Sequence, residues 1–167
     1  MRADGQVVKL SFSDGIKFEI LPAFATSDWY NNITYKYPDT NMGGNWRSTN
    51  PKAEQDAMIA KNKSSNGLLY DTCKHMRFIR DNYFKSYHLS GIVIDSFAYA
   101  AIGNWRWTPP EEPSSAAEAG EYEKMLYNHY INNLRFLSSI KAPGSNDNVD
   151  ISSSKDCLEK VLWKMCE

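Results

Sequence analysis

The chain has 167 residues and a formal net charge of −1, and 42% of its residues are hydrophobic and 13% aromatic. This length suits one domain, or one small domain with part of another, and the aromatic content excludes a disordered chain. A charge near zero excludes a surface that attracts nucleic acid or anionic membranes as a whole, so any polyanion site must be local.

The cysteines and the apolar runs indicate the compartment. Cys73, Cys157 and Cys166 are odd in number and lack the spacing of a zinc or redox motif. The sequence shows no signal peptide, and no apolar run approaches the ~20 residues of a membrane-spanning helix. We therefore expect a soluble, cytoplasmic protein without a membrane partner.

The first element expected in the chain is a β-hairpin. Residues 7–12 and 16–21 are apolar-rich runs that flank Ser-Asp-Gly at residues 13–15, which is a turn signal. The period of two places Glu19 in the middle of the second strand, on the face opposite the Ile and Phe side chains. Two interpretations of Glu19 remain open: a side chain on the wet face of an edge strand, or a metal-binding carboxylate whose partners lie elsewhere.

A long loop and a helix are expected next. Residues 26–45 are rich in Asn, Tyr, Asp and Gly and contain turn signals, which predicts a loop over or beside a site. Asn50 and Pro51 then suit the cap and the first position of a helix that reaches about residue 62. The N-terminus of that helix could hold an anion.

The next two helices carry the chain's most regular apolar patterns. Apolar residues repeat at three and four positions over residues 68–83, with Lys74, Arg77 and Arg80 on other faces. Arg77 and Arg80 could grip one phosphate together, or they could form a solvated basic face. The following apolar helix, which ends near residue 102, should be central and buried. Its Asp95 needs a partner, and Arg77 is a candidate.

The remaining chain predicts helices and a connector. We expect a fourth helix over residues 116–140, a polar connector over 143–150 that contains a Gly-Ser turn, and a last helix capped by Ser153 and Asp156. A β segment followed by a mainly helical bundle is an α+β pattern. We place the boundary between the two parts at residues 47 and 48.

Several common catalytic patterns are missing from the sequence. It contains no P-loop and no Gly-x-Ser-x-Gly elbow. Its histidines are not spaced as metal ligands, so we expect structural roles for them and assign no zinc site. These histidines are His75, His88 and His129.

Four short motifs, taken in order, resemble the C-terminal part of the cyclic GMP-AMP synthase/DncV-like nucleotidyltransferases (CD-NTases), which are relatives of the oligoadenylate synthetases. The motifs are Phe-Glu-Ile-Leu-Pro-Ala at 18–23, Gly-Asn-Trp at 44–46 with Thr-Asn-Pro at 49–51, Arg-Phe-Ile-Arg at 77–80, and Ser-Tyr-His-Leu at 86–89. The resemblance covers the chain from about residue 7 to 102. It implies that the hairpin is the end of a nucleotidyltransferase palm sheet.

The resemblance also implies an activity and a set of site residues. Such enzymes join NTP substrates into cyclic or linear oligonucleotide second messengers by two-metal phosphoryl transfer with Mg²⁺, and serve in bacterial antiphage signalling. Glu19 matches the third metal-binding acid, where Asp is usual, and is the implied catalytic residue. The implied nucleotide-binding residues are Arg80, which stands where Lys is usual, together with Arg77, Lys74, Asn50 and Ser86.

The family's Gly-Ser loop and its Asp-x-Asp strand precede the third acid, whereas only eighteen residues precede Glu19 and none form those motifs. We therefore expect a chain that is inactive alone and that needs an N-terminal catalytic segment or a partner chain. Two alternatives remain open. One is a non-catalytic module that binds nucleotides or protein, and the other is a helical interaction domain whose hairpin completes another chain's sheet.

Overall fold

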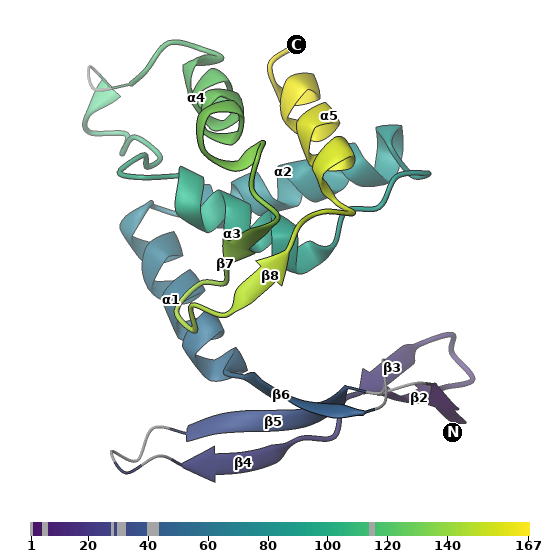
Figure 1. Cartoon of the computed structure of the whole chain (residues 1–167). Helices are drawn as coiled ribbons and strands as arrows, with labels where there is room; N and C mark the ends of the chain where they lie inside the picture. Colours follow the sequence, from purple (N-terminus) through teal and green to yellow (C-terminus); the bar gives the residue numbers. More distant parts are fainter. Residues whose placement is uncertain (1, 5–6, 28, 30–32, 40–43, 114–115) are drawn as a thin grey trace. The chain divides into compact units, whose positions relative to one another are not determined.

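The computed structural model describes residues 2–4, 7–27, 29, 33–39, 44–113 and 116–167. Most of the strands come first and the helices follow, with one short hairpin among the helices, so the predicted α+β class is confirmed (Figure 1). The chain forms two compact units, Met1–Pro51 and Lys52–Glu167, which are described separately below. No helix among the described residues has both the length and the apolar character needed to cross a membrane.

The first unit begins with the expected hairpin. Strands β2 (Val7–Ser11) and β3 (Lys17–Ile20) pair antiparallel, and β1 (Arg2–Asp4) adds a third strand on the other side of β2. The turn closes as the sequence predicts, because the Ile16 backbone N–H donates a hydrogen bond to the Asp14 carboxylate at 3.0 Å. The prediction of a hairpin is therefore confirmed.

The predicted long loop over residues 26–45 is wrong, because three strands occupy most of this part of the chain. Strands β4 (Phe24–Ser27), β5 (Ile33–Asp39) and β6 (Asn45–Thr49) form an antiparallel sheet in the order β4-β5-β6. Each strand contains the Thr, Tyr, Ile, Phe or Trp residues that favour extended backbone.

Pro38 explains why a turn was predicted in this sheet. The pairing between β4 and β5 ends at Lys36, so Pro38 lies beyond β4 and pairs only with Trp46 of β6. A residue without a backbone N–H is tolerated where a strand has one neighbour. The Tyr-Pro-Asp sequence therefore stays extended.

Apolar side chains of the first unit are exposed. All four residues of β3 are exposed, and Phe18 retains 55% of its accessible surface. Phe12 packs edge-on against Phe18, and Phe24 packs in the same way against Trp46, with ring centroids 5.6 Å and 5.4 Å apart. Both pairs cluster rings without burying them, and the Phe12–Phe18 pair fits a hairpin that has one open apolar face.

The second unit is mainly helical. Its helices are α1 (Pro51–Ser64), α2 (Leu68–Tyr83), α3 (Gly91–Ala101), α4 (Glu121–His129) and α5 (Lys155–Met165), with a π-helical turn η2 (Tyr130–Leu134) and the hairpin strands β7 (Ser139–Lys141) and β8 (Asn148–Asp150). Pro51 is the first residue of α1, as predicted, and α2 has the predicted bounds. These helices were recognisable because their end signals and apolar periods agree.

The core of this unit surrounds α3, which is the buried central helix that the sequence predicts. The fully buried side chains include Phe97 of α3, Leu69 of α2, Leu126 of α4 and Leu162 of α5. Helix α1 has no buried residue. Helices α2, α3, α4 and α5 therefore share one apolar core, with α1 at its edge.

Three predictions in the C-terminal third are wrong. The helix expected over residues 116–140 is the nine-residue α4 followed by η2, and the polar connector is the β7–β8 hairpin. The predicted capping box is also displaced, because Ser154 rather than Ser153 precedes α5 and makes no side-chain cap hydrogen bond. The Ser154 side chain is instead buried, and its Oγ accepts a hydrogen bond from the Ser90 N–H at 3.5 Å.

Candidate functional site

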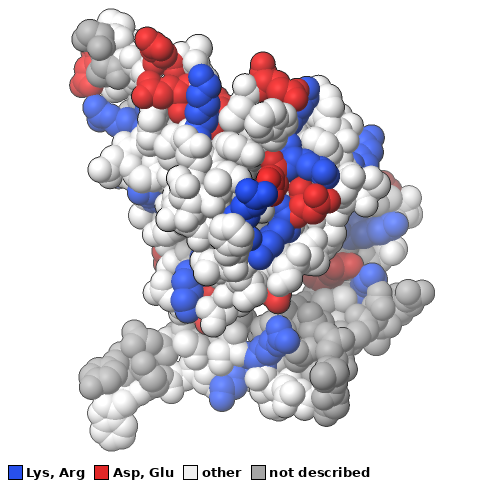
Figure 2. All heavy atoms as spheres, turned by 45° about the horizontal axis from the view of Figure 1, so that its top comes forward, with Lys and Arg blue, Asp and Glu red and all other residues white. Residues whose placement is uncertain are grey.

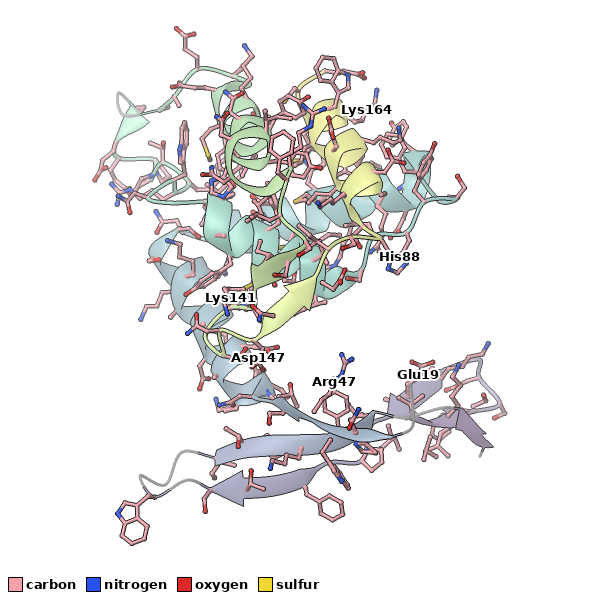
Figure 3. The ribbon with its side chains drawn as sticks, viewed as in Figure 1. Glu19, Arg47, His88, Lys141, Asp147 and Lys164 are labelled. Atoms are coloured by element: carbon pink, nitrogen blue, oxygen red, sulfur yellow. The ribbon has the colours of Figure 1, made fainter. Side chains whose placement is uncertain are left out.

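Glu19, the candidate metal ligand, lies on β3 in the first unit (Figure 3). It faces Lys9 across the β2–β3 ladder, and their side chains form an ion pair at 3.2 Å. The Glu19 side chain is 61% exposed, so its carboxylate oxygens are accessible to a ligand. An exposed carboxylate suits a hard cation such as Mg²⁺, which prefers oxygen ligands, but a single carboxylate cannot form a two-metal site.

No group of three or more His, Cys, Asp or Glu side chains among the described residues is placed to hold a metal ion. Glu19 therefore needs further oxygen ligands from outside this set if it is to hold two ions. The ion pair with Lys9 is equally consistent with a side chain on the wet face of an edge strand. Geometry alone thus leaves both interpretations of Glu19 in place.

Arg77 of α2 makes the ion pair that the sequence predicts. Its Nη2 donates to both carboxylate oxygens of Asp95 on α3, at 2.7 and 2.8 Å, and lies 3.4 Å from the Gly91 carbonyl oxygen. Both side chains are about two-thirds buried. Arg77 therefore ties α2 to the first turns of α3, and the predicted pairing with Asp95 is confirmed.

Arg80, one turn further along α2, is also held by neighbouring groups. Its Nε donates to Asp81 at 2.7 Å, and its Nη1 donates to the Leu89 carbonyl at 2.9 Å. The hydrogen bond to Asp81 raises the pKa of the Arg80 guanidinium and lowers the pKa of the Asp81 carboxyl. Arg80 thus stays cationic while it holds the connector between α2 and α3.

The other candidate residues are more accessible. Lys74 is 75% exposed and lies 3.4 Å from Asp71, which also accepts a hydrogen bond from the Trp107 indole at 3.0 Å. The bond from Trp107 is the main reason why the pKa of Asp71 is lowered. Ser86 is exposed in the α2–α3 connector, and Asn50 is half-buried directly before α1.

The structure brings four of the six candidate residues into one region of the second unit. Lys74, Arg77 and Arg80 come from successive turns of α2, and Ser86 lies in the connector that Arg80 holds. Glu19 and Asn50 belong to the first unit. Acidic and basic side chains are interspersed on the face of the helical unit seen in Figure 2, so no extended basic surface dominates that face.

Sequence reasoning missed the contact between Arg80 and Leu89. A three-residue spacing of arginines predicts that both can reach one ligand, but it says nothing about a carbonyl nine residues ahead. No sequence signal identifies such a contact, because it depends on where the connector turns. Arg80 therefore acts first as an anchor of the connector that carries Ser86, and Arg77 as an anchor of the first turns of α3.

Removal of Arg77 should destabilise the helical unit. Replacement by Ala leaves Asp95, whose side chain is about two-thirds buried, without the Arg77 Nη2 donor. We expect the free energy of unfolding to fall by about 1–3 kcal/mol. Chemical denaturation of Arg77→Ala, Asp95→Ala and the double variant should show strong coupling between the two sites. Additive losses would contradict the assignment of a stabilising pair.

A protein-family model covers the candidate metal ligand. The model for the Second Messenger Oligonucleotide or Dinucleotide Synthetase domain matches residues 1–62, which include Glu19 and Asn50. No protein with curated function matches the chain at a significant level.

Two solved structures share the fold. The STING-associated CdnE c-di-GMP synthase from Capnocytophaga granulosa is 14% identical, with a TM-score of 0.62 over 96% of this chain and 53% of that one. The Elizabethkingia meningoseptica CdnE cyclic dinucleotide synthase, determined with GTP and Apcpp, is 13% identical, with a TM-score of 0.59 over 98% and 62% of the two chains. The chain thus spans somewhat more than half the length of each.

Together these matches confirm the resemblance to CD-NTases. The domain model supports it for the N-terminal part of the sequence, and the solved structures support it for the fold. At these identities the structural likeness establishes the fold alone.

Proposed function

We propose that this chain belongs to a nucleotidyltransferase that joins NTPs into a cyclic or linear oligonucleotide signal, with release of pyrophosphate. The observation that carries the proposal is the synthetase domain match over residues 1–62, because it includes the strand with Glu19. In this proposal the chain supplies the third metal-binding carboxylate and the helical lobe that faces the nucleotide. Antiphage signalling in the cytoplasm is the setting that the resemblance favours.

The role proposed for Glu19 is to hold metal. When bound, two Mg²⁺ ions would activate a ribose hydroxyl and stabilise the leaving pyrophosphate. Glu19 has the exposed oxygens that this role requires, and its ion pair with Lys9 orients the carboxylate. Its side chain is one methylene longer than the usual Asp, so its carboxylate reaches further from the strand.

The role proposed for the α2 residues combines binding with positioning. Arg80 has a partly exposed guanidinium beside Asp81, where it can contact a triphosphate while its Nη1 holds the Leu89 carbonyl. That contact fixes the connector that carries Ser86. Lys74 would add a further polar contact, and the resemblance alone keeps Asn50, in the first unit, as a candidate nucleotide contact. The ion pair of Arg77 Nη2 with both carboxylate oxygens of Asp95 makes Arg77 a positioning residue first.

Loss of Arg80 should weaken nucleotide binding. We expect Arg80→Ala to reduce the affinity for a non-hydrolysable NTP by about 1.5–3 kcal/mol, the usual range for hydrogen bonds to charged groups. Because Arg80 also holds Leu89, Arg80→Ala should lower the melting temperature slightly as well. Isothermal titration calorimetry beside a thermal melt measures both effects.

Arg106 provides a matched control for this experiment. It is an arginine of the same unit, ion-paired at 3.0 Å with Glu112 and half exposed. Arg106→Ala should leave nucleotide affinity unchanged. An equal loss of affinity in both variants would indicate a nonspecific charge effect and would contradict the role proposed for Arg80.

A complementation assay tests the proposed activity. The chain alone should make no product from NTPs and Mg²⁺, because Glu19 is the one acid in it that matches the family's three. A polypeptide with the Gly-Ser and Asp-x-Asp motifs, such as one encoded directly upstream, should restore phosphatase-resistant oligonucleotide synthesis. Nucleotide binding without turnover in the complemented mixture would favour the non-catalytic module.

A further inference from the structure

A pocket of about 320 Å³ lies in the helical unit, where the connector between α3 and α4 (residues 102–120, Figure 1) meets the start of α2. Three aromatic side chains line it, namely Trp105, Trp107 and Tyr122. Small or apolar side chains complete much of the lining, namely Leu68, Ala116, Ala117 and Ala119. The volume suits a small molecule, and the pocket includes none of the six candidate residues described above.

Trp107 forms a wall of the pocket that is held in place by three hydrogen bonds. Its backbone N–H donates to the Ser65 carbonyl at 3.1 Å, and its carbonyl oxygen accepts from the Asn66 side chain at 2.9 Å. Its indole N–H donates to the Asp71 carboxylate at 3.0 Å, yet 52% of the residue stays exposed. A tethered ring that is still half exposed loses little freedom when a ligand binds to it.

Trp105 and Tyr122 contribute the other two rings. Their centroids lie 5.4 Å apart, and the ring planes are tilted by 51°. The Tyr122 hydroxyl shares a hydrogen bond of 2.7 Å with the hydroxyl of Thr72, which is buried in α2. The polar end of Tyr122 is thereby satisfied within the protein, so its aromatic carbons are what it offers to a ligand.

The charged groups give the pocket an acidic character. Glu118 and Glu123 both line it. Arg106 lines it as well, but the Arg106 Nη2 is paired with Glu112 at 3.0 Å, so the charge of the guanidinium is balanced by its own partner. Two carboxylates therefore set the sign of the local potential, which favours a cation and disfavours an anion.

The carboxylate of Asp71 adds to this preference through Trp107. Its hydrogen bond from the indole N–H is the main reason why the pKa of the Asp71 carboxyl is lowered, so the group is ionised at neutral pH. A negative charge bonded to the indole N–H polarises the ring and increases the electron density on its faces. The exposed face of Trp107 therefore attracts a cation more strongly than an isolated indole does.

A quaternary ammonium group matches an aromatic pocket with acidic groups better than a primary ammonium does. It has no N–H to donate, and its charge is spread over methyl groups, so it can exchange water for ring faces at little cost. A primary ammonium has three donors that need acceptors when water is removed. Indole, alanine and leucine side chains do not supply such acceptors.

We propose that this pocket binds a small quaternary ammonium compound of the choline type. Cation–π contacts with Trp105, Trp107 and Tyr122 hold the cation, and Glu118 and Glu123 attract it. This site lies outside the proposed nucleotidyltransferase activity and does not depend on it. Because the pocket forms where the connector is tied to α2, a bound ligand should also raise the melting temperature of the helical unit.

Titration of the 167-residue chain with choline and two analogues tests the ligand class. Dimethylbutanol, in which carbon replaces the charged nitrogen of choline, should bind about fivefold or more weakly because cation–π attraction is lost. Ethanolamine keeps a charge but lacks the methyl groups, and should also bind more weakly than choline. Calorimetry at constant ionic strength gives the affinities. Equal binding of choline and dimethylbutanol, or no binding of choline, would overturn the proposal.

Phosphocholine distinguishes a free compound from a lipid headgroup as the source of the ammonium. It should bind more weakly than choline, because Glu118 and Glu123 repel its phosphate. Tighter binding of phosphocholine would overturn the assignment to a free compound and would assign the pocket to a headgroup.

Pocket variants and a matched control locate the site. Trp107→Leu removes a ring but keeps an apolar wall and should weaken choline binding about fivefold, whereas Trp107→Phe should retain most of the affinity. Glu118→Gln should weaken binding as well. Trp163→Leu is the control, because Trp163 is 57% exposed in the same unit but packs against Tyr127. Thermal melts confirm that each variant is folded. Choline affinity that survives both Trp107→Leu and Glu118→Gln would overturn the proposal.

Discussion

Replacement of Glu19 by Gln should lower oligonucleotide synthesis in the complemented enzyme by about 10²-fold or more, the scale seen when one electrostatic contact to the transition state is lost. Gln keeps the shape of the side chain but removes the negative charge that a metal ligand supplies. The Glu19 side chain is 61% exposed, so the change should affect folding little. Initial rates at saturating Mg²⁺ and NTP, beside a thermal melt, measure both effects.

Lys9 separates the two interpretations of Glu19. Lys9→Met breaks the cross-strand ion pair and keeps the carboxylate. If Glu19 is a metal ligand, the rate of oligonucleotide synthesis should fall strongly in Glu19→Gln and only slightly in Lys9→Met. An edge-strand salt bridge predicts similar, small effects of both changes on stability, since exposed ion pairs contribute little. Full activity of Glu19→Gln would show that the metal role is wrong.

The parts of the fold that sequence predicted well are those determined by local signals. Helix α2 has the predicted bounds because its apolar period is regular and Gly67 precedes it. The first hairpin followed from a turn signal between two alternating runs. Arg77 and Asp95 were paired because a half-buried acid in an apolar helix requires a cation, and the preceding helix offered one.

The parts that were missed depend on contacts between distant residues. Sheet β4-β5-β6 was hidden by Pro38, Asp39 and Asn45, whose turn preference was overridden by pairing between β5 and β6. The β7–β8 hairpin was missed for a different reason, because each of its strands has only three residues. Two- and three-residue alternations are too short to distinguish a strand from a polar connector.

In the candidate site too, local sequence patterns predicted some features, whereas others depend on contacts between distant residues. Periodicity placed three cations on α2, but the contact from Arg80 to Leu89 requires knowledge of the connector's path. The aromatic pocket joins side chains from α2, the α3–α4 connector and α4, which are far apart in sequence. No local sequence motif predicts such a site. Its residues are brought together only by the packing of the helices.

The β7–β8 hairpin loop approaches α1 so closely that Gly144 has no room for a side chain. A Cβ at Gly144 would lie 2.3 Å from the Ala53 carbonyl oxygen and 2.9 Å from the Ala57 Cβ, and the Gly144 φ is +67°. Beside it, the Ser145 hydroxyl donates to Glu54 at 2.9 Å. Lys141 and Asp147, which flank this loop, are labelled in Figure 3. The loop thus holds the N-terminal half of α1 against the helical unit.

Gly144→Ala should therefore lower the free energy of unfolding by about 2–5 kcal/mol, which combines the cost of overpacking with that of a left-handed backbone at a non-glycine residue. Gly120→Ala is the matched control, because Gly120 has a φ of +81° but nothing within 4 Å of its added Cβ. That change should cost only the backbone part, about 1–2 kcal/mol. Urea denaturation of both variants gives the difference. Equal losses would mean that the loop shifts away from α1 at no cost, in which case it does not fix the helix.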